Sequence, residues 1–364
     1  MNLSFRPDRS LCVGNTALLR DLPECICVVE DVLGNGCFLK ATMEATDSRH
    51  DINLGALYGI KRLVACGRSV PFWMTPSVGT LTADIPGDTQ FLMLELCDDT
   101  IVIMLPLVDG WFRLSLEHDL DGNLMLVADT GDPETVGTTF TGLLIGAGTD
   151  PYQLMADLAE SAVHALQSCR KRIDKPIPPT VDYFGWCTWD AFYHDVSMDQ
   201  VKTGLESLQK GGIHPRFLIL DDGWQSISDD EDIKEVHGKL LTSFVANEKF
   251  PGDLAETVKM AKATYGVKWF YVWHAVMGYW GGVDPDEMPD YRIEERERCY
   301  NASLTNSWDA GENWRTGPVN TIAPGSVASF YNDYHRHLRL QGVDGVKVDN
   351  QASLESLGED FGGR

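Results

Sequence analysis

The sequence has little positive charge. Lys and Arg number 30 against 54 Asp and Glu, which gives a formal net charge of −24 at pH 7. No long cluster of basic residues offsets this charge locally, so phosphate backbones and anionic lipid surfaces would be repelled. We therefore expect neither nucleic acid nor a membrane as a partner.

The sequence also lacks the usual marks of disulfide, metal and cofactor proteins. The nine cysteines are scattered, with no CxxC pair and no His/Cys group at zinc spacing, which is typical of reduced thiols. The first thirty residues contain no apolar stretch long enough for a signal peptide. Gly146-Ala147-Gly148 has Pro151 where a dinucleotide fingerprint needs its last glycine, and no GxxxxGK loop occurs. These absences predict a cytoplasmic protein without a cofactor.

The length of 364 residues indicates two domains, because single hydrophobic cores stop growing below it. Residues 25–150 carry short apolar runs separated by turn signals, among them 100–108, 111–116, 124–127 and 140–145. Frequent short strands of this kind normally pair into a sandwich. We therefore predict a β-sandwich domain over residues 1–150.

Residues 151–180 are predicted to connect two domains. Asp150 can cap a helix that begins at Pro151, with Leu154 and Leu158 on one face. Prolines at 176, 178 and 179 then prevent a helix from continuing. The second domain should begin directly after them.

Residues 181–364 alternate predicted strands (183–189, 216–221, 268–274 and 343–349) with predicted helices (198–209, 254–264 and 327–340). This order implies a parallel sheet covered by helices. The stretch between Gly281 and Pro324 has weak periodicity and is too long for an ordinary connection, which is typical of a functional or disordered loop.

Acidic residues end three of the predicted strands, at Asp190, at Asp221-Asp222 and at Asp349. Sites in parallel α/β folds form at the carboxyl ends of strands. Because side chains alternate along a strand, Lys347 and Asp349 share a face, and a neighbouring ammonium favours the ionised carboxylate that a nucleophile requires. A structural ion pair is the alternative interpretation.

Aromatic residues accompany these acids: Trp186, Trp189, Trp224 and Trp273 all lie at or near predicted strand ends. Flat rings stack on the apolar faces of a pyranose, while its hydroxyls bond to carboxylates. The combination predicts a carbohydrate site, with Asp221 and Asp222 suited to sugar hydroxyls. Cys187 and His274 are interpreted as packing residues or supporting donors.

A magnesium site made of Asp190, Asp222 and Asp349 is the alternative that the acids leave open, because carboxylates are ligands for hard cations. Lys347 argues against this alternative, since it already supplies positive charge beside them. We therefore predict a site without metal.

Three segments resemble raffinose synthases and alkaline α-galactosidases, also called seed imbibition proteins. They read YFGWCTWDAFY at 183–193, DDGWQSI at 221–227 and GVDGVKVD at 342–349, and the resemblance runs from about residue 55 to the end. It implies a β-sandwich followed by a TIM-type (β/α)8 barrel that acts on α-galactosides with retention, through two carboxylates and no metal.

Carried over to this sequence, the resemblance implies that Asp349 is the nucleophile and that galactose is bound by Trp189, Asp221, Asp222, Trp273 and Lys347. Trp186, Asp190 and Trp224 are further candidates from the strand-end pattern alone. The stretch Asp349-Asn350-Gln351 with Glu355, Leu357 and Gly358 looks more like the α-galactosidase branch. The resemblance thus favours a hydrolase over a galactinol–sucrose galactosyltransferase, with a raffinose-family oligosaccharide or galactinol as substrate.

The sequence departs from the family in length. A retaining mechanism needs a second carboxyl group about 5 to 5.5 Å from the first, and the family takes it from a later barrel strand. The sequence ends fifteen residues after Asp349, and a full barrel takes about 250 residues where 184 follow Thr180. We expect only about the first four β/α units, without the acid/base and without turnover. A sugar-binding fragment without catalysis is the remaining alternative.

Overall fold

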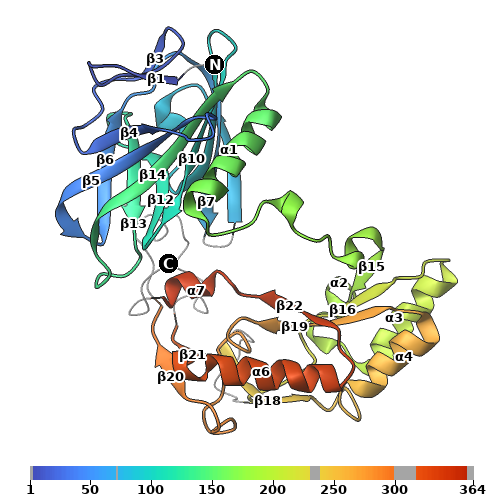
Figure 1. The fold of residues 1–364 in the computed structure, drawn as a ribbon. Helices are drawn as coiled ribbons and strands as arrows, with labels where there is room; N and C mark the ends of the chain where they lie inside the picture. Colours follow the sequence, from blue (N-terminus) through green and yellow to red (C-terminus); the bar gives the residue numbers. More distant parts are fainter. Residues whose placement is uncertain (1–2, 71–72, 230–237, 299–316, 359–364) are drawn as a thin grey trace. The chain divides into compact units, whose positions relative to one another are not determined.

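The computed structural model describes residues 3–70, 73–229, 238–298 and 317–358. The chain divides into two compact units (Figure 1). Unit 1 contains the described residues up to Lys175 together with 354–358, and unit 2 contains those from Pro176 to Ser353. Within these described ranges, no helix is long and apolar enough to cross a membrane.

Unit 1 is built from antiparallel strands. A three-stranded sheet is formed by β1 (Leu3–Phe5), β2 (Leu11–Val13) and β3 (Thr16–Leu19). An eleven-stranded sheet follows, made of β4 (Ile26–Glu30), β5 (Cys37–Asp47), β6 (Arg49–Gly55), β7 (Ile60–Val70), β8 (Trp73–Gly79), β9 (Thr89–Leu96), β10 (Ile101–Pro106), β11 (Val108–Asp109), β12 (Phe112–His118), β13 (Leu124–Asp129) and β14 (Gly137–Gly148). The predicted all-β character of this region is confirmed.

The larger sheet is continuous and folds over its own core. Strands β4, β5, β14, β10, β9, β7 and β8 form one part and β11, β12, β13 and β6 the other, joined through the pair Leu116–Thr89. The two parts face each other closely, because a Cβ atom on Gly142 of β14 would lie 2.8 Å from Leu126 and 3.0 Å from Leu114. The structure thus shows one curled sheet where the sequence predicted two separate sheets.

The predicted local signals of this region are confirmed. The turn between β12 and β13 uses Gly122 at φ +78°, and the Asp119 carboxylate accepts the backbone N–H groups of Asp121 and Asn123. Helix α1 (Pro151–Leu166) begins after Asp150, whose carboxylate accepts two backbone N–H groups of the first turn. Its Leu154 side chain packs with Leu144 on the outer face of the sheet.

Unit 2 contains a four-stranded parallel sheet in the order β15 (Gly185–Cys187), β16 (Phe217–Leu220), β19 (Trp269–Ala275) and β22 (Gly345–Asp349). The connecting helices are α3 (Met198–Lys210), α4 (Ala255–Tyr265) and α6 (Pro324–Leu340). The predicted alternation of strands and helices and the parallel pairing are therefore confirmed.

The two faces of the parallel sheet differ in burial. Leu218, Leu220, Phe270 and Val272 point toward the helices and are fully buried, in one core with Val201 of α3, Val258 of α4 and Phe330 of α6. The opposite face carries the half-buried side chains of Phe217, Ile219, Tyr271, Lys347 and Asp349. One face is therefore closed by helices, and the other remains accessible in part.

Short elements that the sequence did not predict surround the sheet. Two antiparallel hairpins pair β17 (Gln225–Ile227) with β18 (Leu241–Ala246) and β20 (Ile293–Arg296) with β21 (Val319–Ile322). Strands β20 and β21 lie within the stretch 281–324, of which residues 299–316 lie outside the described residues. Short helices are α2 (Trp189–Phe192), α7 (Ser353–Ser356) and the 3-10 turns Thr82–Asp84, Arg172–Asp174, Pro179–Asp182 and Tyr193–Asp195.

Candidate active site

The strand register brings the predicted residues to one edge of the parallel sheet. Trp273 of β19 pairs with Lys347 of β22, and Ala275 pairs with Asp349. Asp221 follows Leu220, which pairs with Val272, so Asp221 lies level with Trp273 and Lys347. Side chains at one level of a parallel sheet point to the same face. Asp221, Trp273 and Lys347 therefore lie on one face of the sheet at the same level.

Asp221 is held by three donors. The Lys347 Nζ atom donates to Oδ2 at 2.6 Å, the Cys187 Sγ atom donates to Oδ2 at 2.9 Å, and the backbone N–H of Asp222 donates to Oδ1 at 2.9 Å. Its own backbone N–H donates to the Thr188 hydroxyl at 3.0 Å. Only 3% of Asp221 is exposed. Such a carboxylate is paired inside the protein, as a buried charge must be.

The two side chains that donate to Asp221 stay protonated at neutral pH. Burial lowers the pKa of Lys347, but the hydrogen bond to Asp221 and the charges of Asp221 and Asp349 outweigh it, so the pKa is raised. Burial, followed by the hydrogen bond to Asp221, raises the pKa of the Cys187 thiol to about 11. Cys187 is therefore a hydrogen-bond donor to Asp221.

The hydrogen bonds of Asp349 differ from the contact with Lys347 that the sequence predicted. The sequence pattern paired Lys347 with Asp349, yet the Lys347 Nζ atom bonds to Asp221 at 2.6 Å, reaching across β19, which lies between β16 and β22. Asp349 instead accepts the Trp273 Nε1–H at 3.1 Å and the Asn350 backbone N–H at 2.7 Å, one on each oxygen. Its side chain is half-buried, and the charge of Asp349 acts on Lys347 without a direct ion pair.

Asp222 is enclosed by donors from other elements. Its Oδ1 accepts the Tyr279 hydroxyl at 2.9 Å, and its Oδ2 accepts the Trp280 Nε1–H at 2.9 Å and lies 3.2 Å from His194 Nε2. Only 2% of Asp222 is exposed. Burial and then the charge of Asp222 raise the pKa of Tyr279, which keeps its hydroxyl protonated. Asp222 therefore organises aromatic side chains around the sheet edge.

Two of the four predicted tryptophans pack against other parts of unit 2. Trp224 is fully buried and donates its Nε1–H to the Trp273 backbone carbonyl at 2.9 Å. Trp186 points toward α3, where a Cβ atom on Gly204 would lie 2.2 Å from its ring. Side chains alternate along β15, so Trp186 faces the helices while Cys187 faces the site. Trp186 thus packs against α3 and Trp224 lies in the core, so their assignment to the site stays a prediction from the sequence alone.

The other two tryptophans remain at the site. Trp273 is 1% exposed and acts there through its N–H rather than through an open ring face. Trp189 in α2 is half-buried and meets the rings of Tyr193 and His194 edge to face, with centroids 5.2 and 4.9 Å apart. Trp189 is therefore the tryptophan of this set with an aromatic surface near the acids.

The predicted alternative of a metal site is not assembled in the part of the chain that the structure describes. Asp190 is exposed in α2, and no described contact joins it to Asp222 or Asp349. The oxygens of Asp222 already face three protein donors. Across the described ranges, no three His, Cys, Asp or Glu side chains group as ligands.

Several residues of the site were missed by the sequence pattern: Thr188, His194, Tyr279, Trp280 and Asn350. Tyr279 and Trp280 stand in the run Gly278-Tyr279-Trp280-Gly281-Gly282, directly after the predicted third strand, and that run was a signal for them. His194 carried no such signal, because it reaches Asp222 from a turn after α2. His274, interpreted as a packing residue, is 1% exposed.

Comparison with known proteins identifies a family for almost the whole chain. Residues 8–364 match the family model described as raffinose synthase or seed imbibition protein Sip1. The chain belongs to this family. It is 35% identical to a probable galactinol–sucrose galactosyltransferase 6 of Arabidopsis thaliana, over 98% of this chain and 52% of that protein. It is 33% identical to the galactinol–sucrose galactosyltransferase of Pisum sativum, over 90% of this chain and 45% of that protein.

Among solved structures, this member of the raffinose synthase family resembles the α-galactosidase TtGalA from Thermus thermophilus, whose structure was determined in complex with stachyose. The TM-score is 0.52 at 14% identity, and the match covers 91% of this chain and 68% of the other. That likeness concerns the fold. The chain spans about half the length of the curated relatives it matches.

Proposed function

We propose that this chain supplies the nucleophile-bearing half of a retaining enzyme that acts on α-galactosides, with Asp349 as the nucleophile. One observation carries the proposal. Asp349 ends a parallel strand, is half-buried, and has one N–H donor on each oxygen, whereas Asp221 and Asp222 are almost fully buried among several donors. Asp349 thus keeps lone pairs on an accessible carboxylate, as attack on a sugar requires.

The reaction proceeds through two displacements. An Asp349 oxygen forms a bond to the anomeric carbon, the bond from that carbon to the leaving oxygen breaks, and an acid protonates that oxygen. In the second step a water or sugar hydroxyl attacks the anomeric carbon, the same group removes its proton, and the bond to Asp349 breaks. Trp273 Nε1–H and Asn350 N–H hold the carboxylate during both steps.

Galactose binding is proposed for the residues that surround Asp349. The Lys347 side chain is 40% exposed, so its ammonium has protons left for sugar hydroxyls besides the bond to Asp221. Trp189 offers an aromatic surface, and Trp273 lines the site from β19. Asp221 and Asp222 contribute by fixing Lys347 and Trp280.

We also propose that the parallel sheet is the first half of a (β/α)8 barrel. Support comes from its one helix-covered face, its half-buried opposite face, and relatives about twice as long. A barrel interior is filled by side chains from all eight strands, so Phe217, Ile219 and Tyr271 would be covered by the other half. The acid/base would then come from outside these residues.

The acceptor in the second step distinguishes two candidate activities. The relatives at 35% and 33% identity carry the name galactinol–sucrose galactosyltransferase, which favours transfer to sucrose. The stretch from Asp349 to Gln351 favours hydrolysis instead. Incubating the chain, extended to the length of its relatives, with galactinol plus sucrose and separately with an aryl α-galactoside separates the two activities. Inertness toward both would remove the α-galactoside proposal.

The nucleophile itself is tested with a donor that needs no acid. In 5-fluoro-α-galactosyl fluoride the leaving fluoride requires no protonation, and the ring fluorine slows release of the glycosyl ester. We expect mass spectrometry to find one galactosyl adduct on the peptide containing Asp349, and none in Asp349→Asn. An adduct on another carboxylate would overturn the assignment.

The location of the protein remains a proposal as well. The cysteines at positions 12, 25, 27, 37, 66, 97, 169 and 187 are free thiols in the structure. Free thiols are typical of a reducing compartment, which supports the cytoplasm. A reporter fusion to this chain, imaged in cells, tests the location.

A further inference from the structure

One lysine of unit 2 contacts both ends of the segment that carries His194. The Lys249 Nζ atom donates to the His194 backbone carbonyl at 2.5 Å, and the Lys249 carbonyl accepts the backbone N–H of Met198 at 3.2 Å. Met198 is the first residue of α3. Lys249 follows β18, 55 positions after His194 in the sequence. The connection between α2 and α3 is therefore held near both of its ends by one distant residue.

The segment held in this way has a strained backbone. Tyr193, directly after α2, has φ +46° and ψ −142°, a conformation that residues with a side chain rarely adopt. Such a conformation persists only where the surroundings determine it. Gly223 supplies one constraint, because a Cβ atom there would lie 2.6 Å from the His194 carbonyl oxygen. The close approach of Gly223 and the bond from Lys249 thus fix the same carbonyl group.

The surroundings of Lys249 explain why it makes this bond. Burial lowers the pKa of its ammonium, although the negative charges of nearby acids oppose this shift. A charged group withdrawn from water needs a partner inside the protein, and the His194 carbonyl is an acceptor for it. Asn247 places the lysine, since its Oδ1 accepts the Lys249 N–H at 3.1 Å and its Nδ2 donates to the Gly223 carbonyl at 2.9 Å. Lys249 and Gly223 are thus tied to each other beside the turn.

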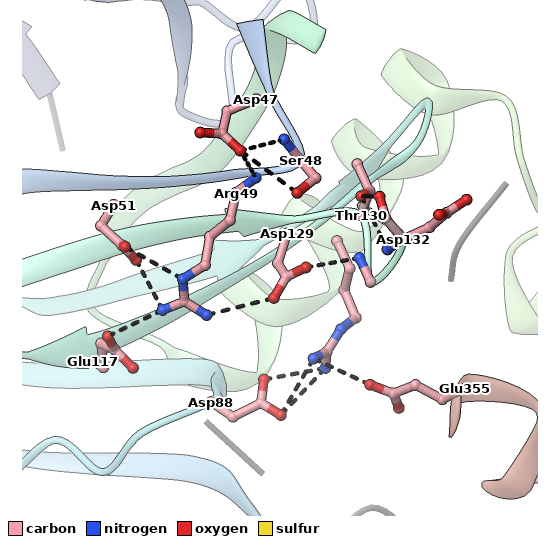
Figure 2. A network of polar contacts seen from close by, with 12 residues as sticks. Asp47, Ser48, Arg49, Asp51, Asp88, Glu117, Asp129, Thr130, Asp132 and Glu355 are labelled. Carbon is pink, nitrogen blue, oxygen red and sulfur yellow. Dashed lines mark hydrogen bonds and ion pairs between the residues drawn. The ribbon is translucent and has the colours of Figure 1, made fainter. Parts of the chain in front are cut away.

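The polar network around Arg49 in unit 1 is built differently (Figure 2). Arg49 of β6 lies 3.4 Å from Asp129 of β13, and these two residues are paired in the strand register. The backbone ladder of the sheet already brings such a pair together. The segment 193–197 belongs to no strand of the described chain. Its position therefore depends on contacts such as the one from Lys249.

Three aromatic side chains depend on where this turn lies. The His194 ring meets Trp189 edge to face, with centroids 4.9 Å apart, and its Nε2 atom lies 3.2 Å from Asp222 Oδ2. The Tyr193 ring meets Trp189 edge to face at 5.2 Å. Tyr193 is 55% exposed and the His194 side chain is 42% exposed, so a ligand can reach both. We call the rings of Trp189, Tyr193 and His194 the aromatic wall.

We propose that Lys249 is a positioning residue for the aromatic wall, an inference that rests on the proposed function because Trp189 is proposed there to bind the sugar. The Lys249 ammonium holds the His194 carbonyl, and the turn then keeps the His194 ring between Asp222 and Trp189. Rings held in this way offer an apolar surface to one face of a pyranose. In the described contacts Lys249 does not touch Asp349, so it acts on sugar affinity rather than on bond formation.

The first test removes the ammonium and keeps the length of the side chain. In Lys249→Met we expect amide hydrogen exchange over residues 189–196 to become about tenfold faster, because the turn loses its anchor. Lys262→Met is the matched control, since Lys262 Nζ also donates to a backbone carbonyl of unit 2, that of Gly342 at 2.7 Å. This control should leave exchange over 189–196 at the parent rate. Unchanged exchange in Lys249→Met would overturn the proposal.

The second test separates binding from bond formation. The rate at which the galactosyl fluoride labels Asp349 is measured over a range of concentrations. In Lys249→Met we expect the half-saturating concentration to rise about tenfold and the maximal rate to stay within about twofold of the parent rate. A chain that is merely less stable would keep the half-saturating concentration of its folded fraction. An unchanged half-saturating concentration would therefore overturn the proposal.

A double variant tests whether Lys249 acts through the wall. His194→Ala removes a ring and keeps the carbonyl that Lys249 meets, so the half-saturating concentration should rise while exchange over 189–196 stays slow. Combined with Lys249→Met, it should give less than the product of the two single effects, because both changes act on the same ring. Effects that multiply would mean that Lys249 acts by another route and would overturn the proposal.

Failure of the proposed function would look different. A parent chain that takes no label at any concentration of the galactosyl fluoride contradicts the role of Asp349 as nucleophile. The exchange measurement on Lys249→Met needs no sugar, so it still decides whether Lys249 holds the turn.

Discussion

Asp221 and Asp349 end two strands of the same parallel sheet, and in the sequence both look like an acid that closes an apolar run. The structure separates them. Asp221 is 3% exposed and accepts Lys347 Nζ, Cys187 Sγ and a backbone N–H. Asp349 is half-buried and has one N–H on each oxygen. The number of protein donors, rather than the position on a strand, distinguishes a carboxylate that holds the site together from one available for chemistry.

The surroundings of each acid explain the difference. Asp221 lies level with Lys347, and Cys187 on the neighbouring β15 adds a thiol. Asp349 lies one level further along, where the residue paired with it on β19 is Ala275, which offers no side-chain donor. Its only side-chain donor in the described contacts comes from Trp273, one level below. The Asp349 carboxylate therefore accepts fewer protein hydrogen bonds than the Asp221 carboxylate.

The largest effect is expected for Asp349→Asn. An amide is a far weaker nucleophile than a carboxylate, so α-galactoside turnover by the chain extended to the length of its relatives should fall by about 10³-fold or more. Stability should change by less than about 1 kcal/mol, because the amide oxygen still accepts the Trp273 N–H. Steady-state kinetics and urea unfolding measure the two quantities. A large loss of stability with activity retained would show that Asp349 is a structural acid and not the nucleophile.

The second effect concerns stability. Asp221→Asn removes the negative charge of the carboxylate to which Lys347 and Cys187 both donate. The new amide offers only one acceptor oxygen. We expect the free energy of unfolding to fall by about 2–3 kcal/mol, below the cost for a fully buried pair because Lys347 is 40% exposed. Urea unfolding of the chain measures it. The matched control is Asp190→Asn at an exposed acid of α2, with a change within about 0.5 kcal/mol. Equal effects would mean that Asp221 is not a structural anchor.

The strand-end acids also show what sequence can and cannot predict. The strands of unit 2 were predicted because their apolar runs are short and separated by segments with helical spacing, and that local pattern survives in β16, β19 and β22. Asp349 was found for the same reason. Its partner was not, because the register between strands decides which acid Lys347 meets, and Asp221 lies 126 positions away in the sequence.

Contacts between distant segments account for the other differences. The donors to Asp222 come from a turn after α2 and from the glycine-rich run after β19, and no local periodicity relates them. The large sheet is made continuous by the pair Leu116–Thr89, which two separate sheets would not contain. Glu355 meets Arg68 across most of the chain. Local patterns predict elements, whereas these contacts are set by packing.

The third effect tests the donor that Asp349 accepts. Trp273→Phe keeps a flat ring in the core but removes the Nε1–H that lies 3.1 Å from Asp349. A hydrogen bond to a charged group contributes about 1.5 kcal/mol, so labelling of Asp349 by the galactosyl fluoride should slow about tenfold. Trp269→Phe, on the same strand and face, is the control and should label at the parent rate. Equal rates in both variants would show that Trp273 does not assist Asp349.

The smallest effect concerns the thiol that donates to Asp221. Burial and then the hydrogen bond to Asp221 raise the pKa of the Cys187 thiol from its ordinary value of 9.0 to about 11. A raised pKa in the folded state means that the stability contributed by this thiol is present below about pH 9 and is lost as the pH rises from about 9 to about 11. Cys187→Ser keeps a donor that does not titrate in this range.

We therefore expect Cys187→Ser to differ from the parent chain by less than about 1 kcal/mol at pH 7 and to lose less stability between pH 9 and pH 11. Urea unfolding of both chains at pH 7, 9 and 11 measures the difference. Titrating groups that do not interact with Cys187, such as the thiol of Cys37, cancel because both chains carry them. Parallel stability curves would mean that the thiol does not donate to Asp221. Asp221 would then have one protein donor fewer, and its contrast with Asp349 would depend on Lys347 and one backbone N–H.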